Sequence, residues 1–277
     1  SLRRRQRQMC IRDRYNMYVI VNRYNMEENM KQGFTLSEVL ITLGIIGVVA
    51  AMTMPTLIQK NQDKELISRI KKTYSDVSNA IIRAQTDYGV VGDNSVLFDP
   101  NNTSIETAEK FVKYFNGAKL CKSKTDRGCA RYYYDIKYAT TKVDAGSSQT
   151  IVDTVNYPKI ILNSGAVLAV YQYNNPDCYK MQEDVATDEY GRPIKNPDGT
   201  NQTITWKNTR CALIRMDVNG LKNPNQFGRD AFGLQVTKQR VEVEGWSFVG
   251  TASLRNILSG KDEFVYTNYA KGDKVKF

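Results

Sequence analysis

Hydrophobic and polar residues divide this chain into segments of clearly different character. From Phe34 to Ile58 the sequence is almost entirely apolar, interrupted only by Thr, Ser, Gly, one Glu and one Pro. A helix over 34–58 would be about 37 Å long, which exceeds the roughly 30 Å hydrocarbon core of a bilayer. The segment therefore predicts a helix that can cross a membrane.

The pattern then becomes amphipathic without a break. Apolar residues recur at alternating spacings of three and four, which places them on one helix face. They are Ile67, Ile70, Tyr74, Val77, Ile81, Ala84 and Tyr88. We expect one long helix that is apolar on all sides at first and then packs along one side of a domain, ending near Gly89 and Gly92. Pro55 lies inside it and should kink or loosen it, either as an ordinary membrane-helix kink or as a functional one.

Beyond this helix the sequence predicts a second helix and then strands. Thr103 and Glu106 fit a capping box, and Gly117 can end the helix that they begin. Its expected buried face consists of Ile105, Ala108, Phe111, Val112 and Phe115. Two apolar runs around 163–165 predict a β-hairpin, and segments 210–220, 231–244 and 246–250 predict further strands. The polar stretch 177–208 predicts a loop insert. The expected fold class is α+β: a long N-terminal helix packed on an antiparallel β-sheet.

Charge and composition exclude several functions. The formal charge is +10, and residues 1–33 carry eight basic against three acidic residues, so half of the excess lies there. A short cytoplasmic flank explains this better than nucleic-acid binding, which we do not expect. Residues 1–25 show no apolar period and resemble translated upstream sequence, so we expect the natural start at Met26 or Met30. The chain has no histidine, which excludes the commonest catalytic bases, and no nucleotide-binding glycine motif.

Five cysteines are present, of which Cys10 lies in the doubtful N-terminal segment. The other four allow three pairings, and we favour Cys121–Cys129, which closes a short loop, with Cys178–Cys211, which closes a long insert. Four-cysteine metal coordination and buried free thiols stay open as alternatives, although no CxxC pair is present. Disulfides would require that this part of the chain be exported.

The stretch KQGFTLSEVLITLGIIGVVAAMTMPTLI resembles the prepilin cleavage and methylation motif of type IV pilins and type II secretion pseudopilins. Lys31 matches the short leader, and Gly33 and Phe34 match the residues on either side of the cut. Glu38 is then the fifth residue of the mature chain and Pro55 the twenty-second.

The resemblance implies a domain organisation and a set of partners. Residues 26–33 would be the leader, 34–58 the membrane and assembly helix, and 59–277 an exported pilin-like domain. A prepilin peptidase would cut between Gly33 and Phe34 and methylate the Phe34 amine. An inner-membrane assembly platform would then bring the subunit together with other pilin-like subunits. The expected location is the bacterial inner membrane, in a single pass with the C-terminal domain outside the cytoplasm, and afterwards the filament.

Glu38 is the one acidic residue in this apolar segment. A carboxylate inside the bilayer is costly unless it is paired. We expect Glu38 of one subunit to pair with the Phe34 amine of its neighbour during assembly, which would fix the register. The alternative is a carboxylate that only reaches toward the headgroups of a plain membrane anchor.

A second resemblance lies in DVNGLKNPNQFGRDAFGL, residues 217–234, which is similar to a segment found near the C-terminal strands of pilin-like domains. It suggests Asp217, Asn219, Asn225 and Asp230 as calcium ligands, because hard oxygen ligands suit that ion. The loop lacks EF-hand spacing, and Gly, Asn and Asp are ordinary turn formers, so we favour a structural turn that joins two strands and expect no cofactor, with calcium binding as the alternative.

We therefore expect a structural, non-enzymatic filament subunit, with a type II secretion pseudopilin as the first interpretation. A true or minor pilin for adhesion or DNA uptake is the alternative within the same class. A membrane-anchored binding module that never assembles, and that uses tyrosine clusters such as 132–134 as a binding surface, is the alternative outside it.

Overall fold

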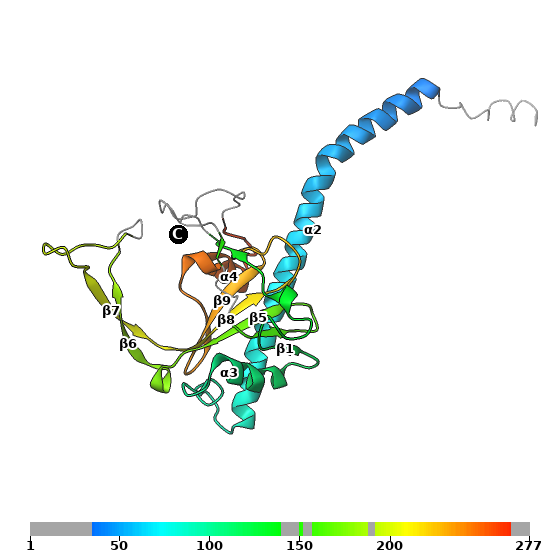
Figure 1. The fold of residues 1–277 in the computed structure, drawn as a ribbon. Helices are drawn as coiled ribbons and strands as arrows, with labels where there is room; N and C mark the ends of the chain where they lie inside the picture. Colours follow the sequence, from blue (N-terminus) through cyan, green and yellow to red (C-terminus); the bar gives the residue numbers. More distant parts are fainter. Residues whose placement is uncertain (1–34, 140–149, 152–156, 188–191, 267–277) are drawn as a thin grey trace, which may run out of the picture. The chain divides into compact units, whose positions relative to one another are not determined.

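The computed structural model describes residues 35–139, 150–151, 157–187 and 192–266. The architecture is α+β, as expected: a long N-terminal helix is followed by a six-stranded antiparallel sheet (Figure 1). Helix α2 (Leu36–Asp87) is continuous through Pro55. The chain divides into two compact units, 1–59 and 60–277, and the boundary falls within α2.

Within the second unit, α2 buries one face against the core. The buried residues are Leu66, Ile70, Thr73, Val77, Ala80, Ile81 and Ala84. This face is rotated slightly from the predicted one. Ile67 and Tyr74 are only half-buried and Tyr88 is 40 % exposed. Thr73 and Ala80 lie in the contact instead, since small side chains let a helix approach a sheet more closely. The helix ends at Asp87, and Gly89 follows with a φ of +69°.

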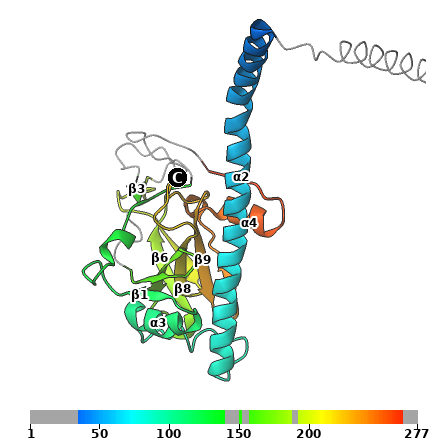
Figure 2. The ribbon, with the colours of Figure 1, turned by 90° about the vertical axis from the view of Figure 1, so that its right-hand side faces the viewer.

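The sheet has the order β1 (Lys119–Cys121), β4 (Lys159–Ile161), β5 (Val167–Gln172), β8 (Arg210–Asp217), β9 (Ala231–Thr237) and β10 (Val241–Val243). All neighbouring pairs are antiparallel. The predicted hairpin is formed by β4 and β5, with Gly165 at a φ of +86° in the turn. Leu168 and Val170 are fully buried on the core face, as are Ile214 and Met216 opposite them. Figure 2 shows the sheet beside the 60–87 part of α2, with α3 at one end of the sheet.

Helix α3 (Ser104–Phe111) begins with the predicted capping box. The Glu106 N–H donates to Thr103 Oγ1 at 3.2 Å, and the Thr103 N–H donates to Glu106 Oε2 at 2.7 Å. The chain continues as η1 (Val112–Tyr114) and turns at Gly117. Phe111 is fully buried, but Ile105 is 39 % exposed, so its assignment to the buried face was wrong.

Two predictions about the C-terminal half were also wrong. Segment 177–208 contains η3 (Pro176–Cys178) and a separate two-stranded sheet of β6 (Lys180–Val185) and β7 (Thr203–Asn208). We refer to β6 and β7 as the ribbon. Nine of the twelve residues in its strands are exposed. Apolar and polar side chains are mixed on both of its faces, so the sequence pattern gave no strand signal.

Segment 246–250 is not a strand but leads into helical structure, η4 (Ser247–Val249) and α4 (Thr251–Leu258). Gly250 at a φ of +80° separates the two, and the Thr251 hydroxyl donates to the carbonyls of Glu244 and Trp246. The remaining short elements are η2 (Ala130–Tyr132), β2 (Ile136–Lys137) and β3 (Thr150–Ile151).

An ion pair joins α2 to the turn between β8 and β9. Arg229 Nη2 lies 2.5 Å from Asp63 Oδ1, and the Arg229 guanidinium stacks on the ring of Phe264 at 4.6 Å. The Arg229 side chain is only 8 % exposed, whereas the Asp63 side chain is 32 % exposed, so the pair is buried on the arginine side and reaches solvent on the aspartate side.

Candidate functional site

The apolar part of α2 is exposed along its whole length. Between 36 and 58 every residue is exposed except half-buried Ala50, and Leu36 and Met52 reach 77 % and 73 %. This is the one helix among the described residues that is long and apolar enough to cross a membrane, and none of its most apolar window is buried. A soluble protein rarely exposes so much contiguous apolar surface, so the segment needs lipid or other helices around it.

Polar groups inside this segment are satisfied locally. Thr42 Oγ1 donates to the carbonyls of Glu38 and Val39, and Thr53 Oγ1 donates to the Val49 carbonyl at 2.9 Å. A hydroxyl that bonds to its own helix costs little in an apolar surrounding. Gly44 and Gly47 have nothing within 4 Å of the position of an added Cβ, so no packing within this chain requires glycine there.

The Glu38 carboxylate caps its own helix. Glu38 Oε2 accepts hydrogen bonds from the Thr35 N–H and the Thr35 hydroxyl, both at 2.8 Å. In return the Glu38 N–H donates to Thr35 Oγ1 at 3.2 Å. This is a second capping box, and its signal, Thr at one position and Glu three residues later, is visible in the sequence although we did not predict it. Both bonds go to Oε2, so Oε1 is left for another donor.

The predicted cleavage site lies outside the described residues, because Gly33 and Phe34 precede Thr35. Pro55 lies in the continuous helix, eight residues before Asp63, whose carboxylate bonds to Arg229. The structure therefore places Glu38 at the start of α2 and Pro55 near the end of its apolar part.

The four predicted calcium ligands do gather in one place, in the turn between β8 and β9. Asp217 and Asp230 are 2 % and 0 % exposed. Asp217 Oδ1 accepts from the N–H groups of Asn219 and Gly220, and Asp217 Oδ2 accepts from the Tyr134 hydroxyl at 2.8 Å. Burial raises the pKa of Asp217 well above its usual value, and the nearby Asp230 charge adds to this.

Asp230 has a different role from Asp217. Its two carboxylate oxygens accept from the backbone N–H groups of Gln226, at 2.7 Å, and Asn225, at 2.9 Å. Burial raises the Asp230 pKa to about 6, although these hydrogen bonds act in the opposite direction. Asp230 thus holds the backbone of the turn through both of its carboxylate oxygens.

The Asn225 amide provides a test of whether a cation fits. One terminal atom of the amide lies 2.9 Å from the Gly220 carbonyl oxygen, 3.0 Å from that of Lys222 and 3.3 Å from Asp217 Oδ2. As an NH₂ group it donates to all three oxygens, which satisfies its hydrogen bonds. As the carbonyl oxygen it would face three other oxygens, an arrangement that only a cation between them would favour. Asn219 Oδ1 is also buried without a hydrogen bond. No group of three His, Cys, Asp or Glu among the described residues could bind a metal, so such a set would be mainly neutral carbonyls.

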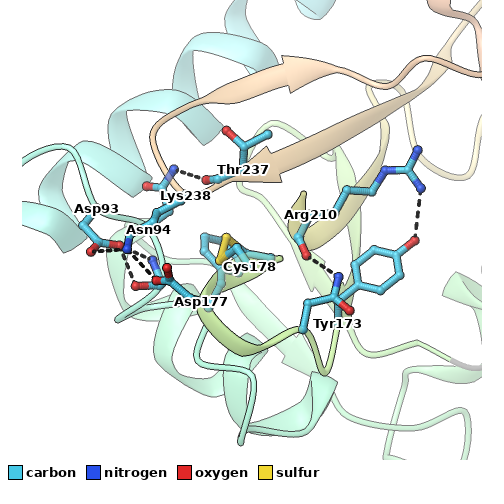
Figure 3. The surroundings of a disulfide bond; sticks show 12 residues. Asp93, Asn94, Tyr173, Asp177, Cys178, Arg210, Thr237 and Lys238 are labelled. Atoms are coloured by element: carbon cyan, nitrogen blue, oxygen red, sulfur yellow. Dashed lines mark hydrogen bonds and ion pairs between the residues drawn. A yellow bond between two sulfur atoms is a disulfide. The ribbon is translucent and has the colours of Figure 1, made fainter. Parts of the chain in front are cut away.

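Both favoured disulfides are present. Cys121 pairs with Cys129, and Cys178 pairs with Cys211, with Cα–Cα distances of 5.6 and 4.4 Å. The second bond ties the base of the ribbon to the start of β8. Around it, Asp177 pairs with Lys238 on one side and Arg210 lies beside Tyr173 on the other (Figure 3).

Comparison with known proteins identifies the N-terminal segment. A family model described as the prokaryotic N-terminal methylation motif matches residues 29–54. This motif is characteristic of type IV pilin-like proteins, including pseudopilins. No curated protein and no solved structure matches the chain.

Proposed function

We propose that this protein is a structural, non-catalytic subunit of a type IV pilin-like filament, and more narrowly a type II secretion pseudopilin. The observation that carries the proposal is the coincidence of the methylation motif at 29–54 with an apolar helix that has no buried side chain between 36 and 58. The motif supplies the processing site, and the helix supplies the surface through which subunits pack.

Export of the domain is part of the proposal. The two disulfides agree with it, because they form and persist in oxidising compartments. After cleavage the chain would span the inner membrane once, with the domain outside the cytoplasm. The peptidase, the assembly platform and other pilin-like subunits would be its partners.

Glu38 would act in assembly through its unoccupied oxygen. The capping bonds from Thr35 occupy Oε2, so Oε1 can accept the Phe34 amine of a neighbouring subunit without disrupting the helix start. An amine and a carboxylate buried together among apolar helices fix one register, since any other leaves a charge unpaired.

Mass spectrometry of the N-terminal peptide from membrane-extracted protein tests the proposal. We expect a chain that begins at Phe34 and carries one added methyl group. A Gly33→Val variant should keep its leader, while a Glu38→Ala variant should still be cleaved. A wild-type chain that retains residues before Gly33, or one that begins after Ile58, would refute the proposal.

The narrower assignment has its own test. Deletion of a secretion pseudopilin abolishes export of a secreted protein, whereas deletion of a pilus subunit removes surface fibres visible by electron microscopy. We expect the first result. Loss of fibres with normal export would instead assign the chain to a pilus.

We also propose that the turn between β8 and β9 binds calcium. Asn225 Oδ1, Asp217 Oδ2 and the Gly220 and Lys222 carbonyl oxygens would be the ligands, because the Asn225 amide atom lies 2.9 to 3.3 Å from each of the other three. Asp230 would position the turn without binding the ion. A calcium ion would neutralise the buried carboxylates and order the turn. One carboxylate ligand among four implies weak, millimolar binding.

A further inference from the structure

The excess positive charge of the domain is concentrated in one short loop. Residues 34–277 contain 31 basic and 26 acidic residues, a formal charge of +5. Residues 119–131 alone contain five basic residues and only Asp126 as an acidic one, which gives +4. We call this segment the basic loop. Outside it, the remainder of residues 34–277 is almost neutral.

All five cations of the basic loop are exposed, and four of them have no carboxylate partner among the residues that the structure describes. They are Lys119, Lys122, Lys124, Arg127 and Arg131. Lys122 forms an ion pair with Glu109. Lys119 donates only to the Arg127 carbonyl oxygen at 3.2 Å, and Arg131 stacks on the Tyr132 ring at 4.9 Å. Four like charges in a loop of 13 residues repel one another, and an acidic partner would relieve that repulsion.

The loop is held rigid independently of these cations. The Cys121–Cys129 disulfide closes it. The Asp126 carboxylate accepts from the N–H groups of Lys122 and Ser123 and from the Ser123 hydroxyl, and these bonds lower the Asp126 pKa. Asp126 is therefore turned toward the backbone of the loop. The cations lie on a preformed scaffold, so binding would cost little loop entropy.

We propose that the basic loop is a docking surface for a linear acidic polysaccharide. A second copy of this chain does not fit, because its surface away from the same loop has almost no net charge. A bilayer fits poorly, because the side chains between the two cysteines are Lys, Ser, Lys, Thr, Asp, Arg and Gly, with no apolar group to insert. The same list holds no aromatic ring on which a nucleic-acid base could stack, and the neighbouring Tyr132 ring is already covered by Arg131.

The choice of polymer rests on the proposed function, which places the domain outside the cytoplasm. A filament would repeat the basic loop along its length, so one polymer could contact many subunits. Repetition of a weak site raises the overall affinity by orders of magnitude. A single loop needs only modest affinity for the surface to work.

The salt dependence of binding tests directly whether the cations of the basic loop bind the polymer. Full-length protein in nonionic detergent is titrated with fluorescein-labelled polygalacturonate, and binding is followed by fluorescence anisotropy. With four unpaired cations and the coefficient known for nucleic acids, affinity should fall about 100-fold between about 50 and 200 mM salt. The triple variant Lys124→Gln, Arg127→Gln and Arg131→Gln should bind more weakly and lose about three quarters of that salt dependence.

A control variant separates the loop from net charge. Lys180→Gln, Lys195→Gln and Lys207→Gln remove the same charge from exposed positions elsewhere, and this variant should bind as wild type does. Equal weakening of both triple variants would overturn the proposal, as would tighter binding to single-stranded DNA or to vesicles containing phosphatidylglycerol. Thermal unfolding of each variant checks that it is folded. Failure of this experiment would leave cleavage at Gly33 unaffected, so the two proposals fail separately.

Discussion

The buried carboxyl pair Asp217 and Asp230 should make this protein lose stability as the pH rises from 5 to 7. Burial raises the pKa of both groups, and that of Asp230 reaches about 6 compared with 3.8 for an ordinary aspartate. The folded state therefore binds protons that the unfolded state has already released. As the pH rises, deprotonation of the folded state places charge in the protein interior, so the free energy of unfolding falls.

The magnitude follows from the shift of Asp230 alone. With a folded-state pKa of about 6 and an ordinary value in the unfolded chain, the free energy of unfolding drops by about 1 kcal/mol between pH 5 and 7. Asp217 acts in the same direction. For a domain of this size, about 1 kcal/mol lowers the Tm by about 2 to 4 °C. The chain has no histidine, so no His side chain titrates in this window.

The assay is thermal unfolding of the full chain in nonionic detergent and a chelator, at pH 5 and pH 7. Asp230→Asn should remove most of the pH difference, whereas Asp198→Asn at an exposed turn should leave it unchanged. Saturating calcium should restore stability at pH 7, because the ion binds the charged form. A Tm that is flat or rises from pH 5 to pH 7 in chelator would refute the reasoning.

Three further outcomes are expected. Thr35→Ala removes the helix cap but leaves the Glu38 carboxylate, so this variant should assemble nearly normally. Glu38→Ala should still be cleaved but should be missing from filaments recovered by shearing. Equal assembly defects in the two variants would mean that Glu38 acts only as a helix cap. If the Asn225 amide oxygen is a ligand, Asn225→Asp should raise the affinity for calcium measured by calorimetry. If this variant is instead strongly destabilised both with and without calcium, the Asn225 side chain is a hydrogen-bond donor. Phe111→Ala should lower the free energy of unfolding, measured with denaturant, by about 3 to 5 kcal/mol because it empties a fully buried site. Ile105 is exposed on the same helix, so Ile105→Ala should lower it much less. Similar losses in both variants would contradict the assignment of Phe111 to the core.

Patterns that are local in the sequence predicted the structure well. A long apolar run followed by a stripe with a 3.6-residue period predicted α2, which spans Leu36–Asp87, and Thr103 with Glu106 located the start of α3. The β4–β5 hairpin follows from two apolar runs around a glycine turn. Such features depend on neighbours a few residues apart, so the chain alone contains the information. The same logic applies to the capping box at Thr35 and Glu38, which could have been predicted from its spacing.

Features that depend on distant contacts were missed. The ribbon has no apolar face, so only its cross-strand pairing, such as Gln182 with Trp206, reveals it as a sheet. The segment after Glu244 has the composition of a strand but becomes helical, because Gly250 takes a left-handed conformation and Thr251 bonds back to the Glu244 carbonyl. Pairing partners and turn geometry of this kind are set by the assembled sheet.

The candidate sites divide in the same way. The sequence by itself determined the methylation motif at 29–54, because the match depends only on the order of residues along the chain and needs no tertiary fold. Only the tertiary structure decided that Asp217 and Asp230 take different roles, and that Lys222 and Gly220 present backbone oxygens to Asn225. The physical reason is that backbone carbonyls are identical in every residue, and only folding selects which of them converge on one point.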